Sequence, residues 1–98
     1  MITDEGSARH LTQGELKMAK AIFKDAIDYR RVRVHHGSYF PFGMQNNKTA
    51  VTPNGHMYYP TLLYKDNFSG TEEEEQWLFI HEMAHVWQYQ MGVNVNFM

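Results

Sequence analysis

The 98-residue sequence contains no cysteine, so a disulfide-stabilised scaffold and a cysteine-rich zinc finger are excluded. Its polar N-terminus lacks the apolar core of a signal peptide, and no apolar run is long enough to span a membrane. The net charge is only −2, and the basic cluster of Lys24, Arg30, Arg31 and Arg33 is small enough to be a solvent-exposed face. Nucleic acid is therefore not an expected partner. The length suffices for one hydrophobic core, which predicts a single domain.

What the sequence does contain is an HExxH motif, His81-Glu82-Met83-Ala84-His85. Two histidines four residues apart on a helix project from the same face and can bind one zinc ion, Zn2+. The carboxylate of Glu82 then lies beside the water that the metal activates, where it can act as a general base. The motif predicts a zinc metallopeptidase that acts on a protein or peptide substrate, with His81 and His85 as metal ligands and Glu82 as the catalytic residue.

The surroundings of the motif predict a long helix over residues 72–91. Thr71 and Glu74 have the spacing of a capping box, the run of glutamates suits the positive end of the helix dipole, and Gly92 is placed to end the helix. The residues around the histidines are uncharged on nearly every side: Trp77, Leu78, Phe79, Ile80, Met83, Ala84, Val86 and Trp87. A helix that is apolar almost all round is expected to be buried, which gives the ligands a rigid setting.

A catalytic zinc needs three protein ligands, and the third is not evident. Position 91, where one class of HExxH peptidases carries a third histidine, is methionine, and no His, Asp, Glu or Cys follows Gly92. Three sources stay open: an upstream residue, a second chain, or a part of the domain beyond residue 98. The upstream candidates are His35, His36, His56 and Asp66. We favour the last source, so that residues 1–98 form one metallopeptidase domain with an incomplete C-terminus, weaker zinc binding and little activity.

The N-terminal part of the sequence predicts a helix over residues 13–28. Residues 1–11 are polar and are expected to be mobile. Thr12 and Glu15 form a second capping box. Apolar residues then recur at helical spacing: Leu16, Ala19, Ile22 or Phe23, Ala26 and Ile27.

Three short strands and a loop are expected between the two helices. Alternating polar and apolar residues predict a strand over 31–35. Residues 38–47 are interpreted as a loop, with Pro41 and Gly43 as breakers and Tyr39, Phe40 and Phe42 as anchors. Strands over 48–52 and 56–59 flank the turn signal Pro53-Asn54-Gly55, which predicts a hairpin.

The order helix, strands, helix predicts an α+β fold with two main helices, a small antiparallel sheet and HExxH on the C-terminal helix. The hairpin over 48–59 is the candidate edge for an extended peptide. Tyr39, Tyr58, Tyr59 and His56 are candidates for polarising a substrate carbonyl, although residues of these types more often only pack.

With these segments in place, the chain resembles the zincin-like metallopeptidase toxin domains at the C-termini of bacterial VgrG and Rhs proteins. The resemblance extends from Leu11 to Gly92, and its specific part is the run from Phe79 to Gln90. The other segments that carry it are Ala21-Ile22-Phe23 through Asp28-Tyr29, Val32-Arg33-Val34, Thr52-Pro53-Asn54-Gly55 and Asp66-Asn67-Phe68-Ser69.

The resemblance implies zinc bound by His81 and His85, catalysis by Glu82, and a third ligand from a downstream glutamate that this sequence does not match. It also implies a secreted antibacterial effector, delivered by a type VI secretion system and acting in the periplasm of a target cell. Its further partners would then be a carrier domain of the secretion machine and an immunity protein.

Two other functions stay open at this point. The chain could be a non-catalytic zinc-stabilised module that binds a partner through the aromatic loop at 39–42 and the hairpin, in which case four ligands would close the metal site. It could also be a structural domain without a metal.

Overall fold

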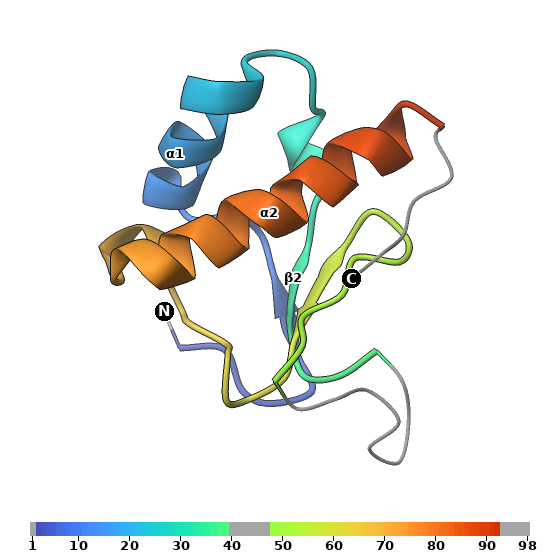
Figure 1. The fold of residues 1–98 in the computed structure, drawn as a ribbon. Coiled ribbons are helices and arrows are strands. Elements are labelled where there is room, and N and C mark those ends of the chain that lie inside the picture. Colours follow the sequence, from blue (N-terminus) through green and yellow to red (C-terminus); the bar gives the residue numbers. More distant parts are fainter. Residues whose placement is uncertain (1, 40–47, 93–98) are drawn as a thin grey trace.

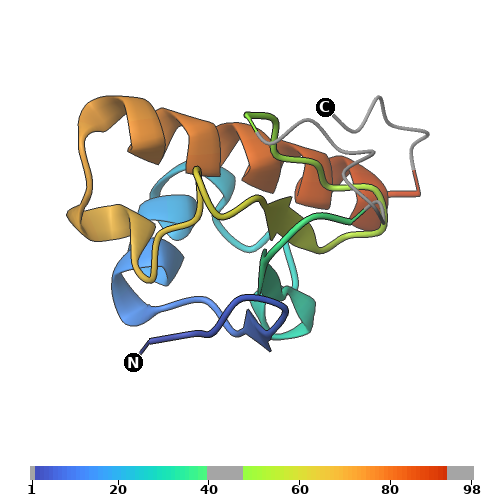
Figure 2. The ribbon, with the colours of Figure 1, turned by 90° about the horizontal axis from the view of Figure 1, so that it is seen from below.

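The computed structural model describes residues 2–39 and 48–92. Its elements are β1 (Ala8–Arg9), α1 (Gln13–Phe23), the 3-10 helix η1 (Tyr29–Arg31), β2 (Val34–His36), β3 (Met57–Tyr59), the 3-10 helix η3 (Phe68–Gly70) and α2 (Glu73–Gln90). Helix α2 passes across the small sheet, and α1 packs beside it (Figure 1). From below, α2 lies along one face of the molecule and β1 on the opposite face (Figure 2). Two helices and a three-stranded sheet confirm the α+β prediction.

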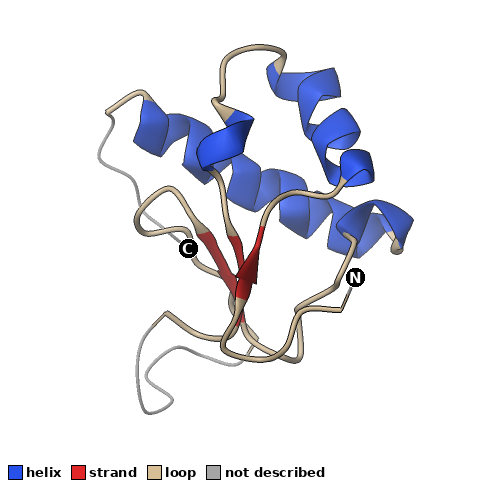
Figure 3. Ribbon diagram, turned by 180° about the vertical axis from the view of Figure 1, so that it is seen from behind, coloured by secondary structure: helices blue, strands red, loops and turns tan. Residues whose placement is uncertain are grey.

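The sheet is mixed, so the prediction of an antiparallel sheet was wrong in part. Its order is β1-β2-β3 (Figure 3). β1 runs antiparallel to β2, with Ala8 opposite His35, whereas β2 and β3 are parallel, with Val34 opposite Met57. The connection between β2 and β3 is long enough for the crossover that parallel pairing requires. Alternation in the sequence reveals a strand but does not reveal its partner, which is why the direction was missed.

The predicted hairpin over 48–59 is present only as one antiparallel bridge. The backbones of Val51 and Tyr58 exchange both hydrogen bonds, at 3.1 and 2.9 Å. No strand forms at 48–52, and the strand expected at 31–35 begins only at Val34 because η1 occupies Arg31. The bridge covers part of the outer edge of β3, which leaves less of that edge for an extended peptide.

The N-terminal segment is a part of the fold and not the mobile lead-in expected from its polarity. The guanidinium of Arg9, in β1, donates to both carboxylate oxygens of Glu15 at 2.8 and 2.9 Å, and to the hydroxyl of Tyr64 at 2.7 Å. Glu15 also accepts the backbone N–H of Phe68 at 2.8 Å. The side chains of Arg9 and Glu15 are 9% and 0% exposed. This shielded ion pair connects β1, α1 and the start of η3.

Helix α1 begins as predicted and ends earlier than predicted. The capping box is confirmed, because Thr12 accepts the N–H of Glu15 while the Glu15 carboxylate accepts the N–H of Thr12. The helix stops at Phe23, and Lys24 takes a positive φ of 53°. Farther on, the backbone N–H of Asp28 is bound at 2.7 Å by the side chain of Gln90 in α2. This tertiary contact holds the segment in a non-helical path that local sequence preference does not indicate.

Helix α2 forms close to its predicted bounds, but its start and its burial differ from expectation. The N-cap is Glu72 without a side-chain hydrogen bond, while the hydroxyl of Thr71 donates to the carbonyl of Phe68 and closes η3 instead. The first turn carries three glutamates, which stabilise the positive end of the dipole. Gly92, with φ of 80°, follows the helix as predicted.

Only one face of α2 is buried. Phe79, Met83 and Val86 lie in the hydrophobic core, whereas Trp77 is 65% exposed. The expectation of a helix buried almost all round was therefore wrong. In the part of the chain that the structure describes, no helix is long and apolar enough to cross a bilayer.

The Arg9–Glu15 pair yields a test of what stabilises the fold. Arg9→Ala leaves the Glu15 carboxylate buried without its cation, and we expect the free energy of unfolding to fall by about 3–5 kcal/mol. The matched control is Arg30→Ala, which breaks the solvent-exposed Arg30–Asp28 pair and is expected to change stability by less than about 1 kcal/mol. Urea unfolding followed by circular dichroism measures both. Equal, small losses in the two variants would contradict this role of the pair.

Candidate metal centre

His81 and His85 project from the same face of α2, as their four-residue spacing predicts. Their ring centroids are 5.0 Å apart and the ring planes are nearly perpendicular, at 88°. Both side chains are half-buried. Two imidazoles this close, on one rigid helix, are placed to share a cation.

Each histidine ring is held by a neighbour on the same helix. Nδ1 of His85 lies 2.9 Å from Oε1 of Gln88. An amide oxygen can only accept, so this contact favours hydrogen on Nδ1 and a lone pair on Nε2, the form in which imidazole binds a metal. The indole of Trp77 stacks on His81 with centroids 5.0 Å apart. Both rings are thereby oriented before any metal binds.

Glu82 lies between the histidines in sequence and points into the protein, where it is 1% exposed. Its Oε1 accepts a hydrogen bond of 2.6 Å from the hydroxyl of Thr52. Burial raises the pKa of Glu82 above its ordinary value, while the Thr52 hydrogen bond and the charges of His85 and His81 act in the opposite direction. A raised pKa makes the carboxylate a stronger base, as proton transfer near neutral pH requires.

Among the residues that the structure describes, no third His, Asp or Glu side chain joins the two histidines. Across residues 2–39 and 48–92 there is no group of three His, Asp or Glu side chains that could hold a metal ion. The stretches outside this part of the chain, residues 1, 40–47 and 93–98, contain no residue of these types. Within this sequence, the candidate centre therefore offers two of the three ligands that a catalytic zinc would require.

None of the four upstream candidates joins the two histidines in a group of three ligands among the described residues, and each makes other contacts. Nδ1 of His36 lies 2.8 Å from the carbonyl of Thr3, and the Asp66 carboxylate accepts the N–H of the same residue at 3.0 Å. His56 accepts the backbone N–H of Arg33 at 3.2 Å, and His35 stacks on Tyr58 with centroids 4.0 Å apart.

The residues proposed to polarise a substrate carbonyl lie in two different settings. Tyr59 is fully buried, and burial followed by the charge of Glu82 raises its pKa well above the ordinary value, so it is a core residue and cannot contact a substrate. Tyr58 and Tyr39 pack edge to face with centroids 4.9 Å apart, beside His35 and His56. The remaining anchors of the predicted loop, Phe40 and Phe42, and its breakers, Pro41 and Gly43, are outside the described residues.

Three side chains that shape the centre were missed from the sequence: Thr52, Gln88 and Trp77. The last two have a local signal, because residues three or four positions from a helical histidine share its face. Thr52 has none, since it precedes Glu82 by thirty residues and only the fold brings the two together.

Comparison with known proteins relates this chain to one kind of bacterial protein. It is 43% identical over 93 residues to the type VI secretion system spike protein VgrG2b of Pseudomonas aeruginosa, and spans 9% of that protein. Its fold matches the solved effector domain of Pseudomonas aeruginosa VgrG2b with a TM-score of 0.84 and 42% identity, over 95% of this chain and 51% of that domain. No family model matches the chain. The part of VgrG2b that this chain matches is thus its effector domain, and this chain spans about half the length of that domain.

The environment of Glu82 yields a second test. Thr52→Val removes the hydroxyl that stabilises the ionised carboxylate, and we expect the pKa of Glu82 in the metal-free protein to rise further. Thr61→Val is the matched control, because it removes a hydroxyl bond of 2.7 Å to the exposed Glu5 carboxylate. Carbon-13 NMR titration of the side-chain carboxyl groups measures the change. An unaltered Glu82 titration in Thr52→Val would show that the hydrogen bond does not set the pKa.

Proposed function

We propose that this chain is the metal-binding part of a zinc metallopeptidase effector domain that hydrolyses peptide bonds. The observation that carries the proposal is the joint placement of His81, His85 and Glu82. Two imidazoles 5.0 Å apart face one side of α2, and a desolvated carboxylate sits within electrostatic reach of both. The similarity to the VgrG2b effector domain supports the part of the proposal that makes this chain an effector domain.

His81 and His85 would hold the zinc ion, with the Gln88 side chain fixing the orientation of the second ring. The donor set fits zinc, since imidazole nitrogen is among its common ligands, although nickel, cobalt and copper accept the same donors. The third ligand would come from a polypeptide segment outside this sequence or from another chain. When bound, the metal would supply Lewis-acid activation of water and of the scissile carbonyl.

Proton transfer during the reaction would be carried out by a residue of this chain. The Glu82 carboxylate takes a proton from the attacking water and later gives it to the leaving amine. Its buried position makes it a stronger base, and the short bond from Thr52 fixes one carboxylate oxygen so that the other can face the reacting water.

The same burial favours an enzyme over a non-catalytic zinc module. A desolvated carboxylate without a permanently cationic side chain to pair with is costly to keep in a fold. A purely structural metal site with closed coordination has no use for a carboxylate of raised pKa that would offset this free-energy cost. Perturbed carboxyl groups next to metal ligands are typical of sites that transfer protons.

Delivery would follow from the kind of protein that shares this domain. VgrG2b of Pseudomonas aeruginosa is a spike protein of the type VI secretion system. We propose that this chain is likewise a secreted effector carried by a VgrG component, and that it acts in the periplasm of a target cell. Its substrate would be a protein or peptide, and an immunity protein would protect the producing cell.

The first test separates metal binding from catalysis. Glu82→Gln keeps the shape and the Thr52 contact but cannot accept a proton, so we expect zinc content to be retained while cleavage falls by about 10²–10⁴-fold. His81→Ala or His85→Ala is expected to lose both. Metal analysis and cleavage of an unfolded protein by the intact effector provide the two measurements.

Glu74→Gln is the control for this experiment, because Glu74 lies exposed on the first turn of the same helix. It is expected to leave both measurements unchanged. Full cleavage by Glu82→Gln would remove the carboxylate from the mechanism. Zinc retained by both histidine variants would refute the metal centre itself.

A further test concerns the orientation of His85. Gln88→Leu removes the amide oxygen that holds Nδ1, and we expect the affinity for zinc to fall by about 10–100-fold. Isothermal titration with zinc, alongside the exposed Gln13→Leu as control, measures the effect. Equal affinities in the two variants would show that Gln88 does not support the ligand.

A further inference from the structure

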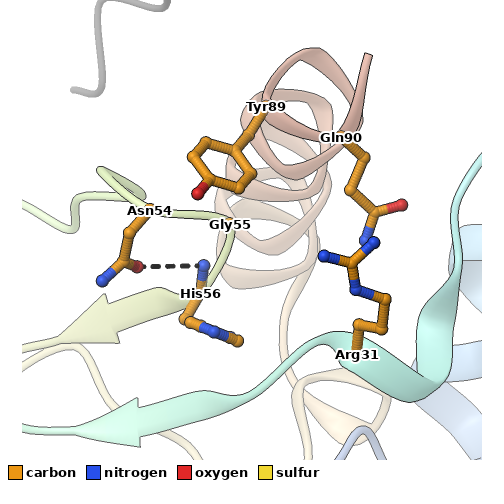
Figure 4. A pocket seen from close by; sticks show the side chains of 6 residues that line it. All are labelled: Arg31, Asn54, Gly55, His56, Tyr89 and Gln90. Atoms are coloured by element: carbon orange, nitrogen blue, oxygen red, sulfur yellow. Dashed lines mark hydrogen bonds between the residues drawn. The ribbon is translucent and has the colours of Figure 1, made fainter. Parts of the chain in front are cut away.

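A second feature of α2 is a pocket at its C-terminal end, with a volume of about 310 Å³. Six residues line it: Arg31, Asn54, Gly55, His56, Tyr89 and Gln90. Tyr89 and Gln90 belong to the last turn of α2, Arg31 to η1, and the other three to the loop that leads into β3 (Figure 4). Three segments far apart in the sequence therefore build it.

The side of the pocket formed by the Tyr89 ring requires a glycine at position 55. Gly55 has a φ of +85°, and a Cβ atom at this position would lie 2.7 Å from Cδ2 of the Tyr89 ring. Only glycine allows the Tyr89 ring to lie against this backbone. The aromatic side of the pocket is therefore fixed by the turn and does not depend on a freely moving side chain.

The two side-chain amide oxygens of the pocket are already engaged. Oε1 of Gln90 accepts the backbone N–H of Asp28 at 2.7 Å, and its amide nitrogen donates to the carbonyl of the same residue at 3.1 Å. Oδ1 of Asn54 accepts the backbone N–H of His56 at 3.3 Å. No carboxylate lines the pocket.

The amide nitrogens of Gln90 and Asn54 are engaged as donors, to the Asp28 carbonyl and the Tyr58 hydroxyl, but three other donor groups remain available. The guanidinium of Arg31 makes no hydrogen bond or ion pair with any residue in 2–39 and 48–92, and the same holds for the Tyr89 hydroxyl. Nδ1 of His56 accepts the N–H of Arg33, so the hydrogen of the neutral ring is on Nε2. Burial, with the charges of Arg33 and Arg31, lowers the pKa of His56, which favours that neutral form. The pocket thus offers a cation and further N–H and O–H donors.

The charge of the pocket is positive in sum. The C-terminus of α2 contributes a partial negative charge of about half an elementary charge, which the full charge of Arg31 exceeds. The nearby Asp28 carboxylate is paired with Arg30 at 3.3 Å. A planar guanidinium matches the two oxygens of a carboxylate.

We propose that this pocket binds a carboxylate group of a peptide. The link to catalysis rests on the proposed peptidase function. Trp77, His81, His85 and Tyr89 recur at four-residue intervals and form one stripe of α2, so the pocket begins about 6 Å along the helix from the second metal ligand. An extended peptide advances by about 3.3–3.6 Å per residue. The pocket thereby selects a C-terminal carboxylate, or an acidic side chain, about two residues from the bond that is cleaved.

Binding can be tested without catalysis. The probes are an N-acetylated tetra-alanine with a free C-terminal carboxylate, the same peptide as its C-terminal amide, an amidated peptide with one internal glutamate, and inorganic phosphate. Each is titrated into the 98-residue protein, freed of metal by a chelator that is then removed by dialysis. Proton NMR signals of the His56 and Tyr89 rings, and the nitrogen signals of the His56 ring, report occupancy.

We expect at least one of the two carboxylate peptides to shift these signals saturably while the neutral amide does not. The tighter of the two identifies whether a terminal or a side-chain carboxylate is the ligand. Arg31→Gln should weaken binding by on the order of tenfold or more, and Arg31→Lys by less, since it keeps the charge. Arg30→Gln, the neighbouring control outside the pocket, should leave affinity within about twofold of the parent protein.

Three results would overturn the proposal: equal binding of the neutral amide, equal losses in Arg31→Gln and Arg30→Gln, or tighter binding of phosphate than of either carboxylate peptide. Because no metal or turnover is involved, binding of the peptides by this chain together with no cleavage by the intact effector would refute the peptidase and leave the pocket standing. Cleavage by the intact effector, together with peptide binding that Arg31→Gln does not weaken, would refute the pocket and leave the peptidase standing.

Discussion

The buried ion pair between Arg9 and Glu15 is the contact on which the arrangement of the chain depends. The Glu15 carboxylate receives the guanidinium, the N–H that caps α1 and the N–H of Phe68, so a single group orders β1, the start of α1 and the entry to η3. Because η3 leads directly into α2, the same group also sets where the helix with the histidines begins. Removing either partner would leave a charge in the interior, and this cost couples the three segments.

The two buried carboxylates of this small fold have different partners, and this difference fits a structural role for Glu15 and the proposed catalytic role for Glu82. Glu15 is matched by a full positive charge, whereas Glu82 has the Thr52 hydroxyl and two imidazoles nearby. A compensated carboxylate is held in its ionised form and serves as a fixed acceptor. A carboxylate that is desolvated without a permanent cation has its pKa raised, and its proton affinity then becomes useful near neutral pH.

The sequence is most informative where interactions are local. The Thr12–Glu15 capping box, the extent of α2 and the shared face of His81 and His85 all follow from spacing along a helix, and the structure bears them out. Long-range contacts are not indicated by the spacing of residues along the chain. The parallel pairing of β2 with β3, the early end of α1 and the position of Thr52 beside Glu82 each depend on segments that meet only in the fold. Thr71 shows that even a well-spaced local signal can fail, because its hydroxyl donates to the carbonyl of Phe68 and Glu72 takes the N-cap position.

The division of α2 into two faces explains how one helix can hold the core and also present the candidate site. Phe79, Met83 and Val86 bury one side, which fixes the helix against the sheet and leaves the stripe from Trp77 to Tyr89 facing outward. The ends of this stripe differ in charge, because glutamates stabilise the positive end of the dipole and Arg31 overcompensates the negative end. A peptide lying along the helix would therefore meet acidic groups before the histidines and a cation after them. The charges that stabilise the helix thus also make the surface around the histidines acidic at one end and basic at the other.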